Sequence, residues 1–345
     1  MTRVCVIGSG YWGPNLVRNL DSLPGKPLYG VSDLREERLA YIKHIYPHVA
    51  VSQDYRTFLD DETVTAAVIA TPAHSHFQLA REFLLRGKHT LVEKPLAMTA
   101  AQCRELIHIA RQNDRVLMVG HTFEYSPAVA RLKEMVQSGD LGDIYYIYSN
   151  RLNLGQIRQD VNVLWNLAPH DISIILSLLQ QEPMVASAKG YSFLQEGIED
   201  VVFLSLDFPG GTGAHIHVSW LDPGKVRRMT VVGSKKMVVY DDTNSEAPLQ
   251  IYDKGVTRNG IPRDAPAFES FGEFQLLLRA GDVHIPKIPA TEPLRDECAH
   301  FIDCIANDAR CRSDGLAGLK VVKVLEAAQH SLRHGSMAVA VPKES

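Results

Sequence analysis

The chain has 345 residues, of which 45% are hydrophobic and 22% charged, and its formal net charge is −4. This length and composition are typical of a two-domain globular protein, and the near-neutral charge gives no electrostatic reason to expect a nucleic acid or an anionic membrane as partner. No apolar run approaches the roughly 18 residues that a membrane span needs. The five scattered cysteines form no CxxC pair, which indicates free thiols in a reducing compartment and argues against a zinc site. We therefore expect a soluble, cytoplasmic protein without a bound metal.

The first third of the chain alternates short apolar runs with amphipathic stretches. Helical spacing of apolar residues, or a helix-start signal, follows each of the first four runs. The runs that read as strands cover residues 3–8, 28–33, 65–70, 89–92 and 116–120. Strands that alternate with helices in this way predict a doubly wound parallel sheet, the architecture of a Rossmann domain.

The pattern changes near residue 123, where strands begin to dominate. Helices are expected over 127–137 and 168–179, and strands over 143–153, 184–193, 200–207, 212–220, 226–232 and 236–241. Few helical signals separate the later strands, which predicts an α+β domain with an open, mostly antiparallel sheet. Residues 242–290, rich in Pro, Gly and Asp, are expected to form loops, and two amphipathic helices close the chain within 292–334.

The expected organisation is therefore α/β with two domains. We expect residues 1–121 to form the Rossmann domain and residues 122–345 to form the α+β domain. The closing helices are candidates for packing back toward the first domain.

A glycine-rich fingerprint lies at the end of the first predicted strand. The segment Gly8-Ser9-Gly10-Tyr11-Trp12-Gly13 matches G-x-G-x-x-G and opens the first predicted helix. In that context the glycines allow a tight turn, close approach of a pyrophosphate and close helix packing, and the helix N-terminus offers N–H donors to the phosphates. The segment is thus a candidate cofactor-binding loop, with a plain glycine turn as the alternative.

The second predicted strand ends at Asp33, which follows Gly13 at the spacing of about 20 residues that the fingerprint requires. A carboxylate there can bind the adenosine ribose hydroxyls and repels a 2′-phosphate, which favours NAD over NADP. Arg35 and Arg38 come next. An arginine at such a position can hold a 2′-phosphate, which leaves NADP open as the cofactor, although such residues are more often solvated helix charges.

Several motifs together resemble the glucose–fructose oxidoreductase / inositol dehydrogenase (Gfo/Idh/MocA) family. The matching segments cover essentially the whole chain and run over residues 6–13, 71–76, 93–96, 120–122 and 166–170. Among them, Glu93-Lys94-Pro95-Leu96 is the most specific mark of the family. Two departures stand out, since Asn166 replaces the usual Asp and Ala168 the usual Gly. The resemblance implies a Rossmann domain followed by an α+β domain whose open sheet often builds dimers or tetramers.

The resemblance also implies roles for individual residues. Lys94 would lie beside the nicotinamide and the reacting carbon, and His170 would give or take the proton. The residues that would line the cofactor are Thr71, Pro72, His76 and Glu93. Because Asn166 stands where the family has Asp, a second carboxylate near the chemistry is absent.

The residue types suit this chemistry on their own terms. Hydride transfer from an alcohol carbon requires that a proton leave the oxygen. A lysine can stabilise the developing alkoxide, and a histidine titrates near neutral pH. The alternatives are a surface lysine for Lys94 and a capping or core-edge histidine for His170. Ligands bind at the carboxyl ends of parallel strands, which favours the functional interpretation of Lys94.

Most of the side chains suited to binding a sugar lie in the second predicted domain. Besides Lys94 and His170, the candidates for substrate binding are Glu124, Tyr125, Arg151, Asn153, Asp160 and Asn166. The motifs look most like family branches that act on nucleotide sugars, including UDP-N-acetylglucosamine 3-dehydrogenases of lipopolysaccharide biosynthesis. The alternatives are a free-polyol or inositol dehydrogenase, a deoxysugar-nucleotide ketoreductase, and an NAD-binding sensor without turnover.

Overall fold

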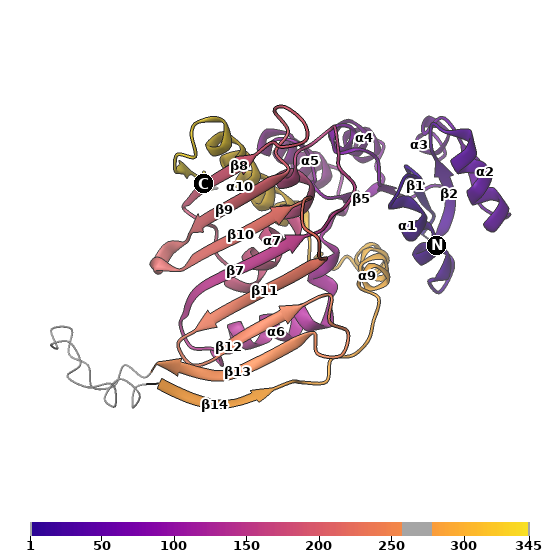
Figure 1. Cartoon of the computed structure of the whole chain (residues 1–345). Helices are drawn as coiled ribbons and strands as arrows, with labels where there is room; N and C mark the ends of the chain where they lie inside the picture. Colours follow the sequence, from indigo (N-terminus) through magenta and orange to yellow (C-terminus); the bar gives the residue numbers. More distant parts are fainter. Residues whose placement is uncertain (1, 257–277, 344–345) are drawn as a thin grey trace, which may run out of the picture. The chain divides into compact units, whose positions relative to one another are not determined.

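The computed structural model describes residues 2–256 and 278–343. The chain divides into two compact units, shown with their elements in Figure 1. Unit 1 comprises Met1–Ser126 and Thr291–Glu326, and unit 2 comprises Pro127–Ala290 and Ala327–Ser345. Within the described residues, none of the helices combines the length and the apolar character that a membrane crossing requires.

Unit 1 is built on a parallel sheet of six strands. In spatial order the strands are β3 (Ala50–Ser52), β2 (Leu28–Ser32), β1 (Val4–Ile7), β4 (Ala66–Ile69), β5 (His89–Glu93) and β6 (Leu117–Gly120). All their pairings are parallel, and this 3-2-1-4-5-6 order is the one that dinucleotide-binding folds use. The predicted parallel sheet is confirmed. The sequence missed β3, a short edge strand whose residues are only partly buried.

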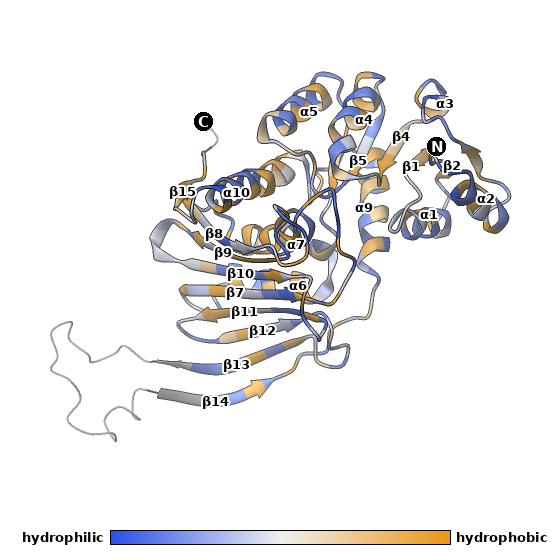
Figure 2. Cartoon of the chain, turned by 45° about the horizontal axis from the view of Figure 1, so that its top comes forward, coloured by the Kyte–Doolittle hydropathy of each residue, from blue (hydrophilic) through white to orange (hydrophobic). Residues whose placement is uncertain are grey.

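Helices connect and cover these strands. They are α1 (Gly13–Ser22), α2 (Glu36–Ile45), α3 (Arg56–Leu59), α4 (Ala73–Leu85), α5 (Ala100–Gln112), the 3-10 turn η1 (Thr122–Tyr125) and α9 (Pro293–Asn307). Figure 2 shows α4 and α5 on one side of the sheet and α1 and α9 on the other. The last helix, α10 (Gly315–Arg333), begins in unit 1 and ends in unit 2.

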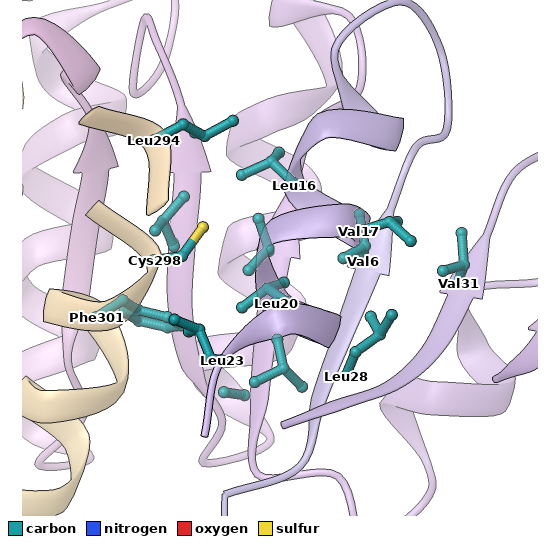
Figure 3. Packing of buried hydrophobic residues seen from close by; sticks show 14 of the residues in the cluster. Val6, Leu16, Val17, Leu20, Leu23, Leu28, Val31, Leu294, Cys298 and Phe301 are labelled. Atoms are coloured by element: carbon teal, nitrogen blue, oxygen red, sulfur yellow. The ribbon is translucent and has the colours of Figure 1, made fainter. Parts of the chain in front are cut away.

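The core of unit 1 depends on a helix from the far end of the chain. On α9, Leu294, Cys298 and Phe301 point at the apolar face of α1, where Leu16 and Leu20 are fully buried (Figure 3). These positions on α9 recur at three- and four-residue intervals, so they form one apolar stripe. Helix α9 therefore completes the hydrophobic core between α1 and the first strands of the sheet.

Unit 2 is built on a mixed sheet of nine strands. In spatial order they are β14 (Leu278–His284), β13 (Leu249–Val256), β12 (Met237–Asp241), β11 (Val226–Gly233), β7 (Ile144–Leu152), β10 (Gly213–Ser219), β9 (Val201–Asp207), β8 (Val185–Tyr191) and β15 (Val339–Ala340). Among these described strands only β7 and β10 pair in parallel. The predicted open, mostly antiparallel sheet is confirmed.

Helices α6 (Pro127–Gln137) and α7 (Val163–Leu179) pack on one face of this sheet. Along β7, Ile147, Ser149 and Arg151 are buried on that face, whereas Tyr146 and Tyr148 alternate with them and are exposed. This period of two is what a sheet covered on one face produces. The other face of the unit 2 sheet thus carries aromatic side chains.

Two predictions for unit 2 need correction. Residues 242–290 are not all loop, because β13 and β14 lie there, while residues 257–277 fall outside the described part. The abundance of Pro, Gly and Asp hid the alternation in β13, where Leu249 and Ile251 are buried. Helix α7 begins at Val163 rather than at 168, because the Asn162 side chain caps it and the helix accommodates Pro169.

Candidate dinucleotide and catalytic site

The glycine loop follows β1 and touches the loop after the neighbouring strand. A Cβ atom on Gly8, whose φ is +97°, would lie 2.7 Å from the Ala70 carbonyl oxygen, and one on Gly13 would lie 2.2 Å from the Gly8 carbonyl oxygen. Both positions therefore require glycine. Gly10 is open, with only an Arg35 guanidinium nitrogen at 3.9 Å from such a Cβ. On the turn that enters α1, Tyr11 is 84% exposed and Trp12 38%.

Helix α1 begins directly at this loop, with Pro14 in its first turn. In this described segment no side chain caps the helix, and its first turn contains no acidic residue. The N–H groups and the positive end of the helix dipole are thus left for an anionic ligand, as a pyrophosphate requires.

Asp33 lies beside the same loop. Its carboxylate accepts hydrogen bonds from the Ser9 N–H at 2.7 Å and the Arg35 N–H at 3.0 Å. The Arg35 guanidinium lies 3.3 Å from it and is half exposed. The predicted ribose-binding acid and the fingerprint glycines are therefore brought together at the carboxyl ends of β1 and β2.

The side chain of His76 contacts both the loop after β4 and the loop after β5. Its ring is buried, with Nδ1 2.7 Å from the Pro95 carbonyl oxygen and Nε2 2.9 Å from that of Thr71. Burial lowers the pKa of His76, against the opposing effect of its hydrogen bonds with the Pro95 and Thr71 carbonyl groups. His76 thus positions the cis Lys94–Pro95 peptide relative to Thr71, while Pro72 is exposed at the start of α4.

Two buried carboxylates lie behind Lys94. Glu93 ends β5 against the backbone of Gly120, and Glu297 on α9 is completely buried. Glu297 accepts a hydrogen bond from the Thr122 hydroxyl at 2.9 Å, and the Lys94 N–H donates to Glu93 at 3.3 Å. The second carboxylate oxygen, Oε1, of each glutamate has no hydrogen-bond partner among the described residues.

Burial makes these carboxylates unusually weak acids. It raises the pKa of Glu93 to about 7, against the opposing effect of the Lys94 charge and a hydrogen bond with the Trp12 side chain. Burial and the charge of Glu93 together raise the pKa of Glu297 well above its ordinary value. Burial and Lys94 lower the pKa of His121, beside this pair, to about 3, so its ring is neutral. Half-buried Lys94 is the cation of this cluster.

Two of the predicted site residues of unit 2 lie on one stripe of α7. Asn166 and His170 are four residues apart and share a helix face. The Asn166 side-chain oxygen accepts a hydrogen bond from the Trp220 indole at 3.1 Å. His170 is half-buried well inside the helix, so its interpretation as a capping residue is wrong.

Other predicted substrate residues are held by contacts within their own unit. Arg151 forms a buried ion pair with Asp171 of α7 at 2.6 Å. The buried Tyr125 hydroxyl lies 3.1 Å from that of Ser313, and the neighbouring Glu124 is also buried. In contrast, the loops after β7 leave Asn153 partly exposed, and the exposed Asp160 pairs with Arg158.

The sequence reasoning missed Glu297 and His121. Glu297 could have been found, because it is a charged residue within the apolar stripe formed by Leu294, Cys298 and Phe301 on α9. His121 follows the last strand of the sheet, at the same edge as Lys94.

An NAD-binding Rossmann unit joined to an open mixed sheet defines a class of two-domain nicotinamide oxidoreductases. A family model described as "Oxidoreductase family, NAD-binding Rossmann fold" matches residues 2–121, and the model of the GFO/IDH/MocA C-terminal domain matches residues 129–239. The chain therefore belongs to the GFO/IDH/MocA oxidoreductase family, and its cofactor is NAD.

Individual relatives span most of the chain. A UDP-N-acetylglucosamine 3-dehydrogenase of Acidithiobacillus ferrooxidans is 28% identical over 326 residues, 93% of this chain and 94% of that protein. A solved structure of an enzyme of that name from the same organism has a TM-score of 0.80 at 25% identity, covering 96% of this chain and 97% of the other. A myo-inositol 2-dehydrogenase of Thermotoga maritima is 24% identical, over 73% of this chain and 79% of that protein.

The glycine loop yields a paired test. Gly10→Ala should leave the fold intact, because its Cβ meets open space, yet weaken NAD binding by about tenfold or more, roughly 1.4 kcal/mol, since the backbone can no longer approach the pyrophosphate. Gly13→Ala should instead lower the melting temperature, because its Cβ collides with backbone. Calorimetric titration with NAD and thermal melts separate the two. Equal NAD affinity of wild type and Gly10→Ala would contradict the assignment.

The buried carboxylates predict an unusual pH dependence of stability. As pH rises from about 4.5 through about 7, the folded chain keeps a proton on Glu93 that the unfolded chain releases, so stability falls with rising pH. Glu297→Gln removes one of the two acids and should therefore stabilise the protein more at pH 8 than at pH 5. Urea unfolding at both pH values measures this. The exposed Glu62→Gln serves as control, and an equal effect of Glu297→Gln at both pH values would refute the explanation.

Proposed function

We propose that the protein oxidises the C3 ring hydroxyl of a nucleotide sugar such as UDP-N-acetylglucosamine, with NAD as hydride acceptor. The observation that carries the proposal is the position of Lys94. This residue directly follows β5 at the carboxyl edge of the parallel sheet in the NAD-binding unit. Ligands of such sheets bind at that edge. A relative that bears this enzyme name, and that this chain matches over 94% of its length, supports the choice of substrate.

Bound NAD would supply the hydride acceptor for this oxidation. The ammonium of Lys94 stabilises the alkoxide that develops on the sugar oxygen, and His170 takes the proton. Gly8, Gly10 and Gly13, with Tyr11 and Trp12 between them, hold the pyrophosphate. The residues that face the remainder of the cofactor are Asp33 at the adenosine ribose, Glu93 at the other ribose, and Thr71, Pro72 and His76 along the nicotinamide half.

Unit 2 supplies the sugar side in this proposal. Asn153, Asp160 and Asn166 offer amides and a carboxylate to sugar hydroxyls, whereas Arg151 acts by holding Asp171 beneath the sheet. An amide at position 166 adds no charge near the reacting oxygen, which leaves proton transfer to His170. Glu124 and Tyr125 support the loop after β6 from within unit 1.

We further propose a cytoplasmic homodimer or homotetramer that serves lipopolysaccharide biosynthesis. The outer face of the unit 2 sheet carries exposed Tyr146, Tyr148 and Phe203, and an apolar face of this kind suits association with a second copy. Light scattering should give a mass of two or four chains, which Tyr148→Glu should reduce. A monomeric wild type would contradict the assembly.

A comparison of substrates tests the sugar assignment. If the nucleotide contributes binding energy away from the reacting carbon, UDP-N-acetylglucosamine should have a kcat/KM at least about 10²-fold above that of free N-acetylglucosamine, a difference of roughly 2.7 kcal/mol. NAD reduction is followed by absorbance, with myo-inositol as a third substrate. Preference for inositol would favour the polyol alternative, and no reduction with any sugar would favour a sensor.

Replacement of the two proposed catalytic residues tests the mechanism. Lys94→Ala should lower turnover by about 10²–10³-fold, roughly 3–4 kcal/mol of lost transition-state stabilisation. His170→Ala should cost on the order of 10²-fold. Neither change should much weaken NAD binding, which depends on the glycine loop and Asp33. A folded Lys94→Ala protein that keeps more than about a tenth of wild-type turnover would overturn the assignment.

A further inference from the structure

The end of α9 brings together an imidazole and two thiols that the proposed reaction does not use. His300 and Cys304 are four residues apart on the helix, so they share a face. The helix ends at Asn307, and the left-handed backbone of the following Asp308 (φ 50°) reverses the chain. Cys311 thereby returns to the same place, and one ligand atom of each of the three side chains lies within 4.8 Å of the others.

The donor set favours a thiophilic ion. Zn²⁺ binds thiolate sulfur at about 2.3 Å and imidazole nitrogen at about 2.0–2.1 Å, so tetrahedral ligands stand roughly 3.5–3.8 Å apart. The His300 Nε2–Cys304 Sγ distance of 3.4 Å is already close to this value. The three ligands include no carboxylate, which disfavours Mg²⁺ and Ca²⁺.

Contacts of Arg312 and Ser313 hold the turn that carries Cys311 close to His300. The Arg312 N–H donates to His300 Nε2 at 3.0 Å, so this nitrogen presents its lone pair to the turn that carries Cys311. The Arg312 guanidinium lies 4.7 Å from the centre of the Tyr125 ring and donates to the Glu124 carbonyl oxygen at 3.0 Å. Next to it, the buried Ser313 hydroxyl donates to the Val119 carbonyl oxygen at 2.8 Å. The turn is thus tied to the end of β6.

We propose that His300, Cys304 and Cys311 form a binding site for Zn²⁺ in unit 1. On binding, both thiols release their protons to solvent, and the two thiolates balance the charge of the ion. His300 exchanges its hydrogen bond from Arg312 for a bond to the metal through the same nitrogen. His300 is partly exposed, so water can complete the four-coordinate shell. The ion fixes the 308–313 turn to α9.

Spectroscopy of the cobalt-substituted full-length protein tests the site. The reduced, metal-free protein should take up one Co²⁺ per chain and show thiolate-to-cobalt charge-transfer absorption, which Zn²⁺ should abolish by displacement. Cys304→Ser, Cys311→Ser and His300→Gln should each weaken Co²⁺ binding at least tenfold. Cys103→Ser, which removes a buried thiol on α5, is the matched control and should bind as wild type does.

Stability supplies a second readout. Zn²⁺ should raise the melting temperature of wild type and Cys103→Ser but not that of His300→Gln, whose partly exposed position makes misfolding a minor risk. Absence of the charge-transfer band in folded wild type would overturn the proposal, as would a band that persists in both Cys304→Ser and Cys311→Ser. Formation of a Cys304–Cys311 disulfide in air without metal uptake under reducing conditions would also overturn it.

Discussion

The parallel alignment of β1, β4, β5 and β6 is the constraint on which the candidate site of unit 1 depends. Strands that run in one direction end at one edge, so residues far apart in sequence meet there. The glycine loop, Thr71, the Glu93–Lys94 pair and His121 all follow strand ends. This alignment requires helical crossovers between strands, and the apolar stripe of α9 completes the core that supports them (Figure 3).

This arrangement places carboxylates where water is excluded. Glu93 and Glu297 are both buried, and their mutual repulsion adds to the cost of ionising either one. The nearby ammonium of Lys94 opposes this cost for Glu93. Lys94 therefore lies beside a carboxyl group whose pKa is raised to about 7, at the strand edge where the proposed reaction needs an alkoxide-stabilising group.

Local patterns predicted much of this organisation. The fingerprint from Gly8 to Gly13, the acid at Asp33 and the strand–helix alternation each have a short-range physical cause. The structure reproduces the alternation and brings the glycine loop and Asp33 together. Contacts between distant segments could not be read in this way. Neither the pairing of Arg151 with Asp171 nor the approach of Cys311 to His300 has a sequence periodicity that reveals it. The β13 strand was missed because composition outweighed its alternation.

In the proposed reaction, hydride would pass from C3 of a nucleotide sugar to NAD bound at this strand edge. The most direct test uses UDP-N-acetylglucosamine with deuterium at C3, incubated with NAD and wild-type protein, and mass spectrometry of the reduced nucleotide. The account predicts that the reduced cofactor carries one deuterium and that a 3-keto sugar nucleotide forms. Reduced cofactor without deuterium, or no reduction by a protein that binds NAD, would contradict it.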